Sequence, residues 1–318
     1  MQKNNCMILK TPLRVTWKIS NKSSINKKIL TDLITSRIFL LKLNLGKFNL
    51  NNEEVSEVIN TLTKNGVRVS INIDISAIDE LLSLDLLNIK FDKLIFEIQS
   101  VKELQKNSKK VEHFNKKFNL PKAVSISLTN NNISEVSSIV ENAKNMHFRE
   151  IIFINDEIAD KKITNKKKYN FSTEKWDGFK KIIKKNHQKW NKEINFTIHD
   201  YFIWKEFPKQ ENDNKVIKGE YNGCQAGNVL AYISTNGDVF PCASMPFKMG
   251  NLQESNFQEI WASEKRKMLY NTLNSELELC MNCRFVDCKG GCKGMSYFLY
   301  NNFNNQDRLC PFKVKEQL

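Results

Sequence analysis

Seven of the eight cysteines in this chain of 318 residues lie in its last third. They are Cys224, Cys242, Cys280, Cys283, Cys288, Cys292 and Cys310. Four of them form the compact run Cys280-Met-Asn-Cys283-Arg-Phe-Val-Asp-Cys288-Lys-Gly-Gly-Cys292. Short loops of this kind can wrap several thiolates around one metal ion or iron–sulfur cluster. We therefore expect the part of the chain after Leu279 to be held together by metal rather than by an apolar core.

The remaining composition indicates the compartment in which these thiols work. A chain of this length buries an ample core and needs no disulfides to fold. No apolar run has the length and flanks of a signal peptide, and none approaches the roughly 20 residues of a membrane helix. We therefore expect a cytoplasmic protein with no membrane partner, in which thiols stay reduced and clustered cysteines bind metal.

The formal net charge of +14 raises the question of a nucleic-acid partner. A basic face could form from a group of lysines in the middle of the chain, namely Lys166, Lys167, Lys168, Lys180, Lys181, Lys184 and Lys185. Lysine is nevertheless spread over the whole chain together with abundant asparagine, and no recognised nucleic-acid-binding module is visible. Nucleic acid is therefore not the expected partner.

The first 200 or so residues alternate short β-rich runs with amphipathic helical segments, an order that predicts βα units and a parallel sheet. Strands are expected at 13–19, 37–43, 67–73, 94–98, 123–128 and 151–154. Helices are expected at 28–35, around 55–62, at 75–87, from 101 onwards, and at 133–145 and 173–190. Six such units are too few for a closed eight-stranded barrel, so the expected fold class is α/β with a partial (β/α)6 TIM-like barrel. The charged stretch 156–170 is expected to be a mobile loop without a role.

The composition changes after a polar, aperiodic stretch at 201–222, where we place a domain boundary. The expected domains are a barrel at 1–205 and a cysteine-rich domain at 206–318. Runs at 229–233 and 238–240 flank Thr235-Asn236-Gly237, a turn signal that predicts a β-hairpin between Cys224 and Cys242. Helices are expected around 257–261 and 265–272, followed by a loop with little periodicity.

The order of the cysteines resembles the SPASM domain of radical SAM peptide-modifying enzymes. Twelve residues separate Cys224 from Gly237, four more lead to Cys242, and the compact run and Cys310 follow. The intervening text agrees with that family in Ile233-Ser-Thr-Asn-Gly-Asp-Val-Phe-Pro-Cys242, Met249-Gly-Asn-Leu252 and Glu259-Ile-Trp261. One departure is the spacing between Cys283 and Cys288, which is four residues where the family usually has five.

The resemblance implies two auxiliary 4Fe-4S clusters. Its first cluster would be held by Cys224, Cys242 and Cys292, and its second by Cys280, Cys283, Cys288 and Cys310. The first cluster has no evident fourth cysteine, and the residues before Cys224 offer only Glu220 and Tyr221 as conceivable ligands, or that iron is open. Zinc is the alternative metal, but seven cysteines are one short of two four-thiolate zinc sites.

The barrel half resembles the radical SAM fold by pattern, because the run from Pro12 to Asn21 mirrors the family's first strand. The CxxxCxxC motif should follow directly, and its three places are Ser23, Lys27 and Leu30. The family's glycine-glycine-glutamate-proline motif matches Leu45-Gly46-Lys47-Phe48, with lysine in the place of glutamate. Cys6 precedes the strand and is expected to be an inert thiol. The resemblance therefore implies that the S-adenosylmethionine site is lost.

These features predict a pseudo-enzyme with no assigned catalytic residue. The resemblance implies an accessory role in the maturation of a ribosomally synthesised peptide. Its partner would be a precursor peptide, an active radical SAM enzyme, or both, held by the open barrel, while the clusters brace the fold or transfer electrons. Three further hypotheses stay open. One is an active radical SAM peptide-modifying enzyme that uses an open auxiliary cluster. The others are an electron-transfer protein unrelated to peptides and a zinc-held binding module.

Overall fold

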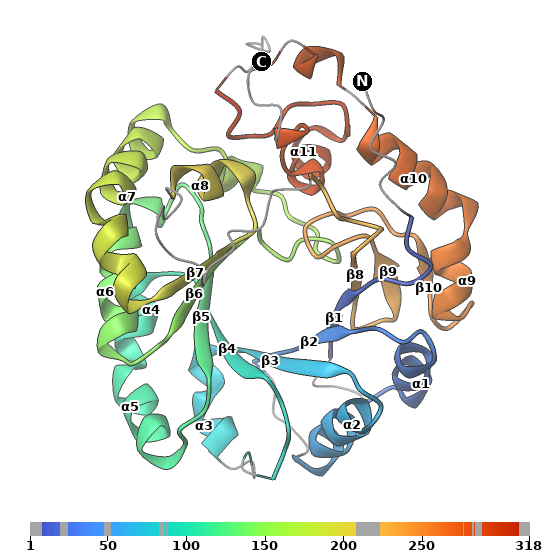
Figure 1. Cartoon of the computed structure of the whole chain (residues 1–318), viewed down its shortest axis with the longest axis horizontal. Coiled ribbons are helices and arrows are strands. Elements are labelled where there is room, and N and C mark those ends of the chain that lie inside the picture. The colour runs from blue at the N-terminus through green and yellow to red at the C-terminus, as the bar shows by residue number, and fades with distance from the viewer. Residues whose placement is uncertain are drawn as a thin grey trace.

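A computed structural model describes residues 8–19, 25–47, 52–82, 86, 88–207, 223–275, 277–281, 283 and 288–311. One 10-stranded sheet has the order β10-β9-β8-β1-β2-β3-β4-β5-β6-β7 (Figure 1). Its strands are β1 Arg14–Lys18, β2 Leu40–Gly46, β3 Arg68–Asp74, β4 Lys93–Ile98, β5 Lys122–Ser127, β6 Glu150–Ile154, β7 Asn195–Ile198, β8 Leu230–Ile233, β9 Asp238–Phe240 and β10 Gly250–Asn251. Neighbours from β1 to β7 are parallel, and β8 is parallel to β1. The fold is therefore the α/β partial barrel that the sequence predicts.

Helices cover the outer side of this curved sheet (Figure 1). The described helices are α1 Lys27–Thr35, α2 Asn52–Lys64, α3 Ile78–Leu82, α4 Val101–Lys106, α5 Ser108–Lys117, α6 Val136–Asn145, α7 Thr173–Glu193, α8 Tyr201–Glu206, α9 Phe257–Ala262, α10 Glu264–Asn274 and α11 Lys293–Tyr300. Of these, α11 lies in the cysteine-rich part and not on the outer side of the sheet (Figure 1). In the described part of the chain, no helix combines the length and the apolarity that crossing a membrane requires.

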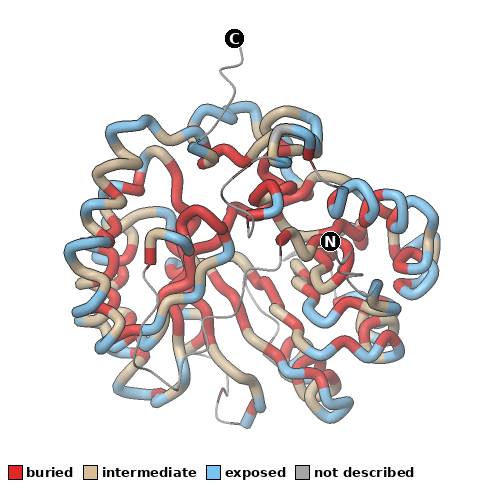
Figure 2. The backbone as a smooth tube through the Cα atoms, turned by 45° about the horizontal axis from the view of Figure 1, so that its top comes forward, coloured by how far each residue is buried: buried red, intermediate tan, exposed pale blue. Residues whose placement is uncertain are grey.

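The two faces of the sheet differ in chemistry because successive side chains of a strand point to opposite sides. On β3, Val69, Ile71 and Ile73 are at most 3% exposed and belong to the apolar core shared with the helices. Asn72, between the last two, instead donates a hydrogen bond to Glu97 of β4 at 3.1 Å. Figure 2 shows how burial concentrates along the strands, while the outer helices carry the exposed positions. The sheet thus packs an apolar face against the helices, while its inner face carries polar groups such as Asn72 and Glu97 as well as a small apolar cluster of Ile95, Ala123, Ile152 and Ile154.

Two strands extend the barrel beyond the six that the sequence predicts. The unpredicted β7 pairs with β6, Glu150 lying opposite Asn195. The first strand of the predicted hairpin, β8, pairs with β1, so that Arg14 lies opposite Leu230 on one side and Leu40 on the other. Because β1 has a partner on both edges, it leaves no unpaired strand edge there. The sheet therefore continues across the expected domain boundary, and the division at 205/206 stays a prediction.

The stretch 156–170, expected to be a mobile loop without a role, is buried at 156–159 and at Tyr169, whereas most residues between them are exposed. The backbone N–H groups of Ile158 and Ala159 donate to the Ala243 carbonyl at 2.8 and 2.9 Å. An apolar cluster joins the segment to α11 and comprises Ile158, Tyr169, Met295 and Phe298. We call residues 155–170 the bridging segment, because they pack between the barrel and the cysteine-rich part of the chain.

Two helices differ from expectation. The helix expected at 75–87 is a 3-10 turn, Ile75–Ala77, followed by the short α3 that ends at Leu82. The loop expected after residue 279 contains α11, whose Met295 and Phe298 are spaced three residues apart on its buried side. Cys292 directly precedes this helix as its N-cap residue. A helix therefore positions one of the candidate ligands.

Candidate metal centre

Three candidate ligands lie at one end of the β8–β9 hairpin, and we call them the first thiol group: Cys224, Cys242 and Cys292. Gly237, with a φ of +81°, turns the hairpin, so the chain before β8 and the chain after β9 leave at the same end. Burial, followed by the neighbouring Cys224, raises the pKa of Cys242 to about 12. Burial also raises the pKa of Cys292, with further contributions from Cys224 and Cys242. The structure therefore brings these three thiols near one another.

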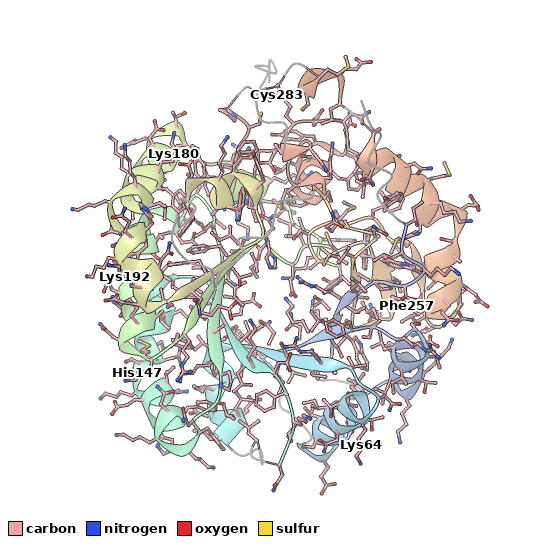
Figure 3. All side chains as sticks on the ribbon, in the orientation of Figure 1. Lys64, His147, Lys180, Lys192, Phe257 and Cys283 are labelled. Atoms are coloured by element: carbon pink, nitrogen blue, oxygen red, sulfur yellow. The ribbon has the colours of Figure 1, made fainter. Side chains whose placement is uncertain are left out.

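The other four candidate ligands form the second thiol group: Cys280, Cys283, Cys288 and Cys310. Burial, then Asp307 and then Cys310 and Cys280, raises the pKa of Cys288 to about 12. Burial raises the pKa of Cys280, and the neighbouring Cys283 raises it further. Figure 3 shows Cys283 at the outer rim of the cysteine-rich part of the molecule. These effects link the four thiols into one neighbourhood.

Hydrogen-bond donors point at the thiols of the first group. The backbone N–H groups of Ala226 and Lys293 donate to Cys224 and lower its pKa against the dominant effect of burial. Asn155, the first residue after β6, donates from Nδ2 to Cys292 Sγ at 3.3 Å. Such donors favour the thiolate, which is the form that binds metal. The first group is therefore prepared to carry negative charge in a buried place.

The donor chemistry fits an iron–sulfur cluster. Buried thiols that raise one another's pKa are ionised once a bound cation offsets their charge. Gly290 and Gly291 have φ angles of +85° and +70°, and a Cβ at Gly291 would collide with the Asp307 side chain. Among the residues that the structure describes, no three His, Cys, Asp or Glu side chains converge on a single ion. The ligand assignment itself stays a prediction.

Two buried charged residues that the sequence analysis did not single out, Asp307 and Arg308, lie near the candidate ligands Cys292 and Cys310. Asp307 accepts hydrogen bonds from the backbone N–H groups of Cys292 at 2.6 Å and Leu309 at 2.7 Å. Arg308 donates to Asn155 Oδ1 at 3.0 Å, which connects the cysteine-rich part to the end of β6. Nothing in the sequence indicates that Asp307 and Arg308 are buried, because charged residues are normally exposed.

Two of the three positions at which the CxxxCxxC motif would lie, Lys27 and Leu30, are described by the structure. Lys27 is exposed at the first position of α1, and Leu30 packs partly buried against the core. Lys28, between them, donates from Nζ to the Leu252 carbonyl at 2.5 Å. Lys47 Nζ lies 3.8 Å from Asp74 Oδ2, and the Lys47 side chain is 75% exposed. The remaining residues singled out in this context, Ser23, Cys6, Glu220 and Tyr221, lie outside the described residues.

Carboxylates of the bridging segment occupy the carboxyl ends of β1 and β2. Glu157 accepts from Lys42 Nζ at 2.7 Å and from Asn44 Nδ2 at 2.5 Å. Asp160 accepts from Lys18 Nζ at 2.8 Å. In barrels of parallel strands, ligands bind at this end of the sheet. The protein's own side chains therefore fill part of the region where a ligand would bind.

Replacing Glu97 by glutamine tests the polarity of this interior and should stabilise the protein more at about pH 8 than at about pH 5. Burial, followed by the charge of Glu157, raises the pKa of Glu97, with Lys42 and Asn72 opposing the shift. The folded state holds a proton on Glu97 more tightly than the unfolded state does, so the free energy of unfolding falls as the pH rises through the folded pKa. Glutamine does not ionise, so the variant does not lose this stability at the higher pH. Urea unfolding of both proteins measures the difference in free energy of unfolding at each pH, and an equal difference at both would contradict the expectation.

Contacts within the protein are seen for three of the seven lysines of the possible basic face, Lys166, Lys168 and Lys180. Lys166 donates to the Leu299 carbonyl at 3.3 Å, and Lys168 pairs with Asp156 at 3.3 Å. Lys180 pairs with Asp177 at 2.7 Å on α7, where Figure 3 shows it on the outer side. These pairs reduce the local positive charge. The expectation that nucleic acid is not the partner stays a prediction.

Comparison with known families and proteins identifies the cysteine-rich part. The family model described as SPASM, iron-sulfur cluster-binding domain, matches residues 224–284. An AdoMet-dependent heme synthase of Nitratidesulfovibrio vulgaris is 27% identical over 122 residues, which cover 37% of this chain and 33% of that protein. One of Methanosarcina barkeri is 28% identical over 94 residues, covering 29% of this chain and 26% of that protein. The matches thus span a third or less of these curated relatives.

Solved structures identify the fold of the whole chain. The structure of Streptococcus suis SuiB bound to S-adenosylmethionine has a TM-score of 0.66 at 15% identity, covering 96% of this chain and 78% of that one. SuiB bound to the precursor peptide SuiA has a TM-score of 0.65 at 14% identity, covering 94% and 75%. Native anSMEcpe with bound AdoMet has a TM-score of 0.60 at 16% identity, covering 88% and 90%. The chain thus shares the fold of SuiB and anSMEcpe, and its residues 224–284 match the SPASM model.

Proposed function

We propose that this chain is a pseudo-enzyme of the radical SAM/SPASM type that carries two auxiliary 4Fe-4S clusters and no S-adenosylmethionine cluster. The observation that carries the proposal is an asymmetry between the two halves of the chain. Seven cysteines follow residue 223, whereas the motif places after β1 hold Ser23, Lys27 and Leu30. Serine and lysine are poor iron ligands, and leucine has no donor atom. The chain therefore has cysteine ligands for the auxiliary clusters and no cysteine ligands for the cluster that binds S-adenosylmethionine.

The proposed ligands are Cys224, Cys242 and Cys292 for the first cluster, and Cys280, Cys283, Cys288 and Cys310 for the second. The division is supported by the pKa effects among the thiols, since those described act within the first or within the second group. When bound, such clusters supply one-electron transfer. The protein contributes backbone N–H donors to sulfur and a buried setting, which together tune the potential.

The contacts of Glu157 with β2 support the loss of S-adenosylmethionine binding. A ligand at the carboxyl ends of β1 and β2 would have to displace Glu157 from Lys42 and Asn44. Lys47 stands where the family's glutamate receives the cofactor's amino group, and a lysine repels that ammonium.

The proposed role is that of an accessory protein in the maturation of a ribosomally synthesised peptide. The similarity to SuiB, which binds the precursor peptide SuiA, supports a peptide partner. An active radical SAM enzyme is the second proposed partner, because a chain without the S-adenosylmethionine cluster needs another protein for that chemistry. The clusters would then brace the fold or pass electrons to this partner.

Anaerobic purification followed by iron and sulfide analysis tests the clusters, and an assay for reductive cleavage of S-adenosylmethionine tests the loss of activity. We expect about eight iron atoms per chain, as two four-iron clusters require, and no cleavage. Cleavage that survives Cys280→Ser and Cys283→Ser but is lost with Cys242→Ser would place activity on an open auxiliary cluster instead. Zinc in place of iron would reduce the protein to a binding module.

A further inference from the structure

Lys293 is a fully buried lysine that lies between the two thiol groups. It is 0% exposed and occupies the first position of α11, directly after Cys292. Its backbone N–H donates to Cys224, so its main chain belongs to the environment of the first thiol group. Lysine is almost never fully buried without a partner that offsets its charge. The position therefore requires an explanation.

The side chain of Lys293 extends towards the second thiol group. A Cβ built on Gly290 would lie 2.7 Å from Lys293 Nζ, and Gly290 stands two residues after Cys288. Lys293 thus directly follows Cys292 of the first group, and its Nζ lies against the loop that leads from Cys288 of the second group to Cys292. Burial lowers the pKa of Lys293, whereas the thiols Cys224, Cys280 and Cys288 and the carboxyl of Asp307 raise it. Nζ donates a hydrogen bond to the Phe303 carbonyl at 3.3 Å. An ammonium group has three donors and a positive charge, which a neutral carbonyl does not offset.

We propose that Lys293 is the shared cation of the two auxiliary clusters and that it raises the reduction potential of the second one. The inference rests on the proposed function, because it needs the clusters that the two thiol groups would hold. One-electron reduction adds negative charge to a cluster whose thiolates are already negative. A buried cation beside it favours the reduced form, and low dielectric surroundings strengthen that effect.

Lys289 provides a matched control within the same cysteine run. It directly follows Cys288, but its side chain is exposed. Its Cδ atom would lie 3.0 Å from a Cβ on Gly223, so it points along the chain before Cys224. Solvent and salt screen an exposed charge far more than a buried one. Replacing Lys289 therefore removes the same formal charge with a much smaller expected effect.

The test is a redox titration with dithionite, followed by EPR, on wild-type protein and on Lys293→Met, Lys293→Gln and Lys289→Met. We expect both Lys293 variants to keep their iron and to disfavour reduction of one cluster at least tenfold, which is about 59 mV for a one-electron couple. Lys289→Met should shift the same couple by less than a third of that. A shift no larger in the Lys293 variants than in Lys289→Met would overturn the proposal.

Iron content separates this inference from the proposed function. Wild-type protein without a second cluster would contradict the proposed function itself. Wild-type protein with both clusters and an unchanged potential in the Lys293 variants would contradict only the role of the lysine. Loss of iron from both Lys293→Met and Lys293→Gln would also overturn the inference, because Lys293 would then be needed for assembly rather than for the potential.

Discussion

Replacing Cys288 by serine is expected to remove about half of the iron from the anaerobically purified protein, from about eight to about four atoms per chain. Cys288 is 7% exposed and belongs to the second thiol group, so its loss should empty one cluster and spare the other. Cys292 is only four residues further along but belongs to the first group. Cys292→Ser should therefore also remove about half of the iron, but from the cluster held by the first thiol group.

Double variants test which thiols bind the same cluster. Cys288→Ser combined with Cys310→Ser should lose no more iron than Cys288→Ser alone, because both thiols belong to one cluster. Cys288→Ser combined with Cys292→Ser should lose nearly all of it. Cys6→Ser is the control and should keep the wild-type iron content. Iron analysis and EPR provide the measurements, and full loss of iron from each single variant would contradict two separate clusters.

Replacing Arg308 by methionine is expected to lower the free energy of unfolding by about 3–5 kcal/mol, the range for a broken buried ion pair. The Arg308 side chain is 1% exposed, as is that of Asp200, and Nη2 lies 3.8 Å from Asp200 Oδ2. Nη1 donates to the Tyr169 carbonyl at 3.2 Å, so the guanidinium also holds the bridging segment. Among the described residues, Asp200 Oδ2 has no hydrogen-bond partner.

Removal of Arg308 leaves this carboxylate in an apolar setting without a counter-charge. The double variant Arg308→Met/Asp200→Asn should therefore recover part of the lost stability, because the uncompensated charge is gone. Lys168→Met is the matched control, since its pair with Asp156 is partly exposed and is expected to contribute at most about 1 kcal/mol. Urea unfolding of samples with equal iron content measures all three. Equal losses in Lys168→Met and Arg308→Met would contradict the buried-pair explanation.

Periodicity predicted most elements of the barrel because their burial follows local rules. The strand expected at 67–73 is β3, Arg68–Asp74, and the helix around 55–62 is α2, Asn52–Lys64. The four-residue β7 was missed, since so short a run between two helices carries too little alternation to be recognised. The helix α11 was missed because it begins directly after the last cysteine of the run and has only eight residues, so its helical spacing is hard to recognise.

The bridging segment shows the limit of local reasoning most clearly. It is rich in charge and poor in apolar residues, a composition typical of an exposed loop. Ile158 and Tyr169 nevertheless bury against Met295 and Phe298, more than a hundred residues away in the chain. Neither partner can be recognised from the segment itself. The burial of Glu157 has the same origin, because its partner Lys42 belongs to β2.

The sequence by itself determined the inventory of thiols, the absence of cysteine at Ser23, Lys27 and Leu30, and the class of the barrel. These follow from residue identity and from periods of two and 3.6 residues, which short-range backbone geometry imposes. Only the tertiary structure decided that Glu157 meets Lys42 and that Lys293 lies between two groups of thiols. Such contacts join residues that are distant in the chain, so they depend on how whole elements pack rather than on any local pattern.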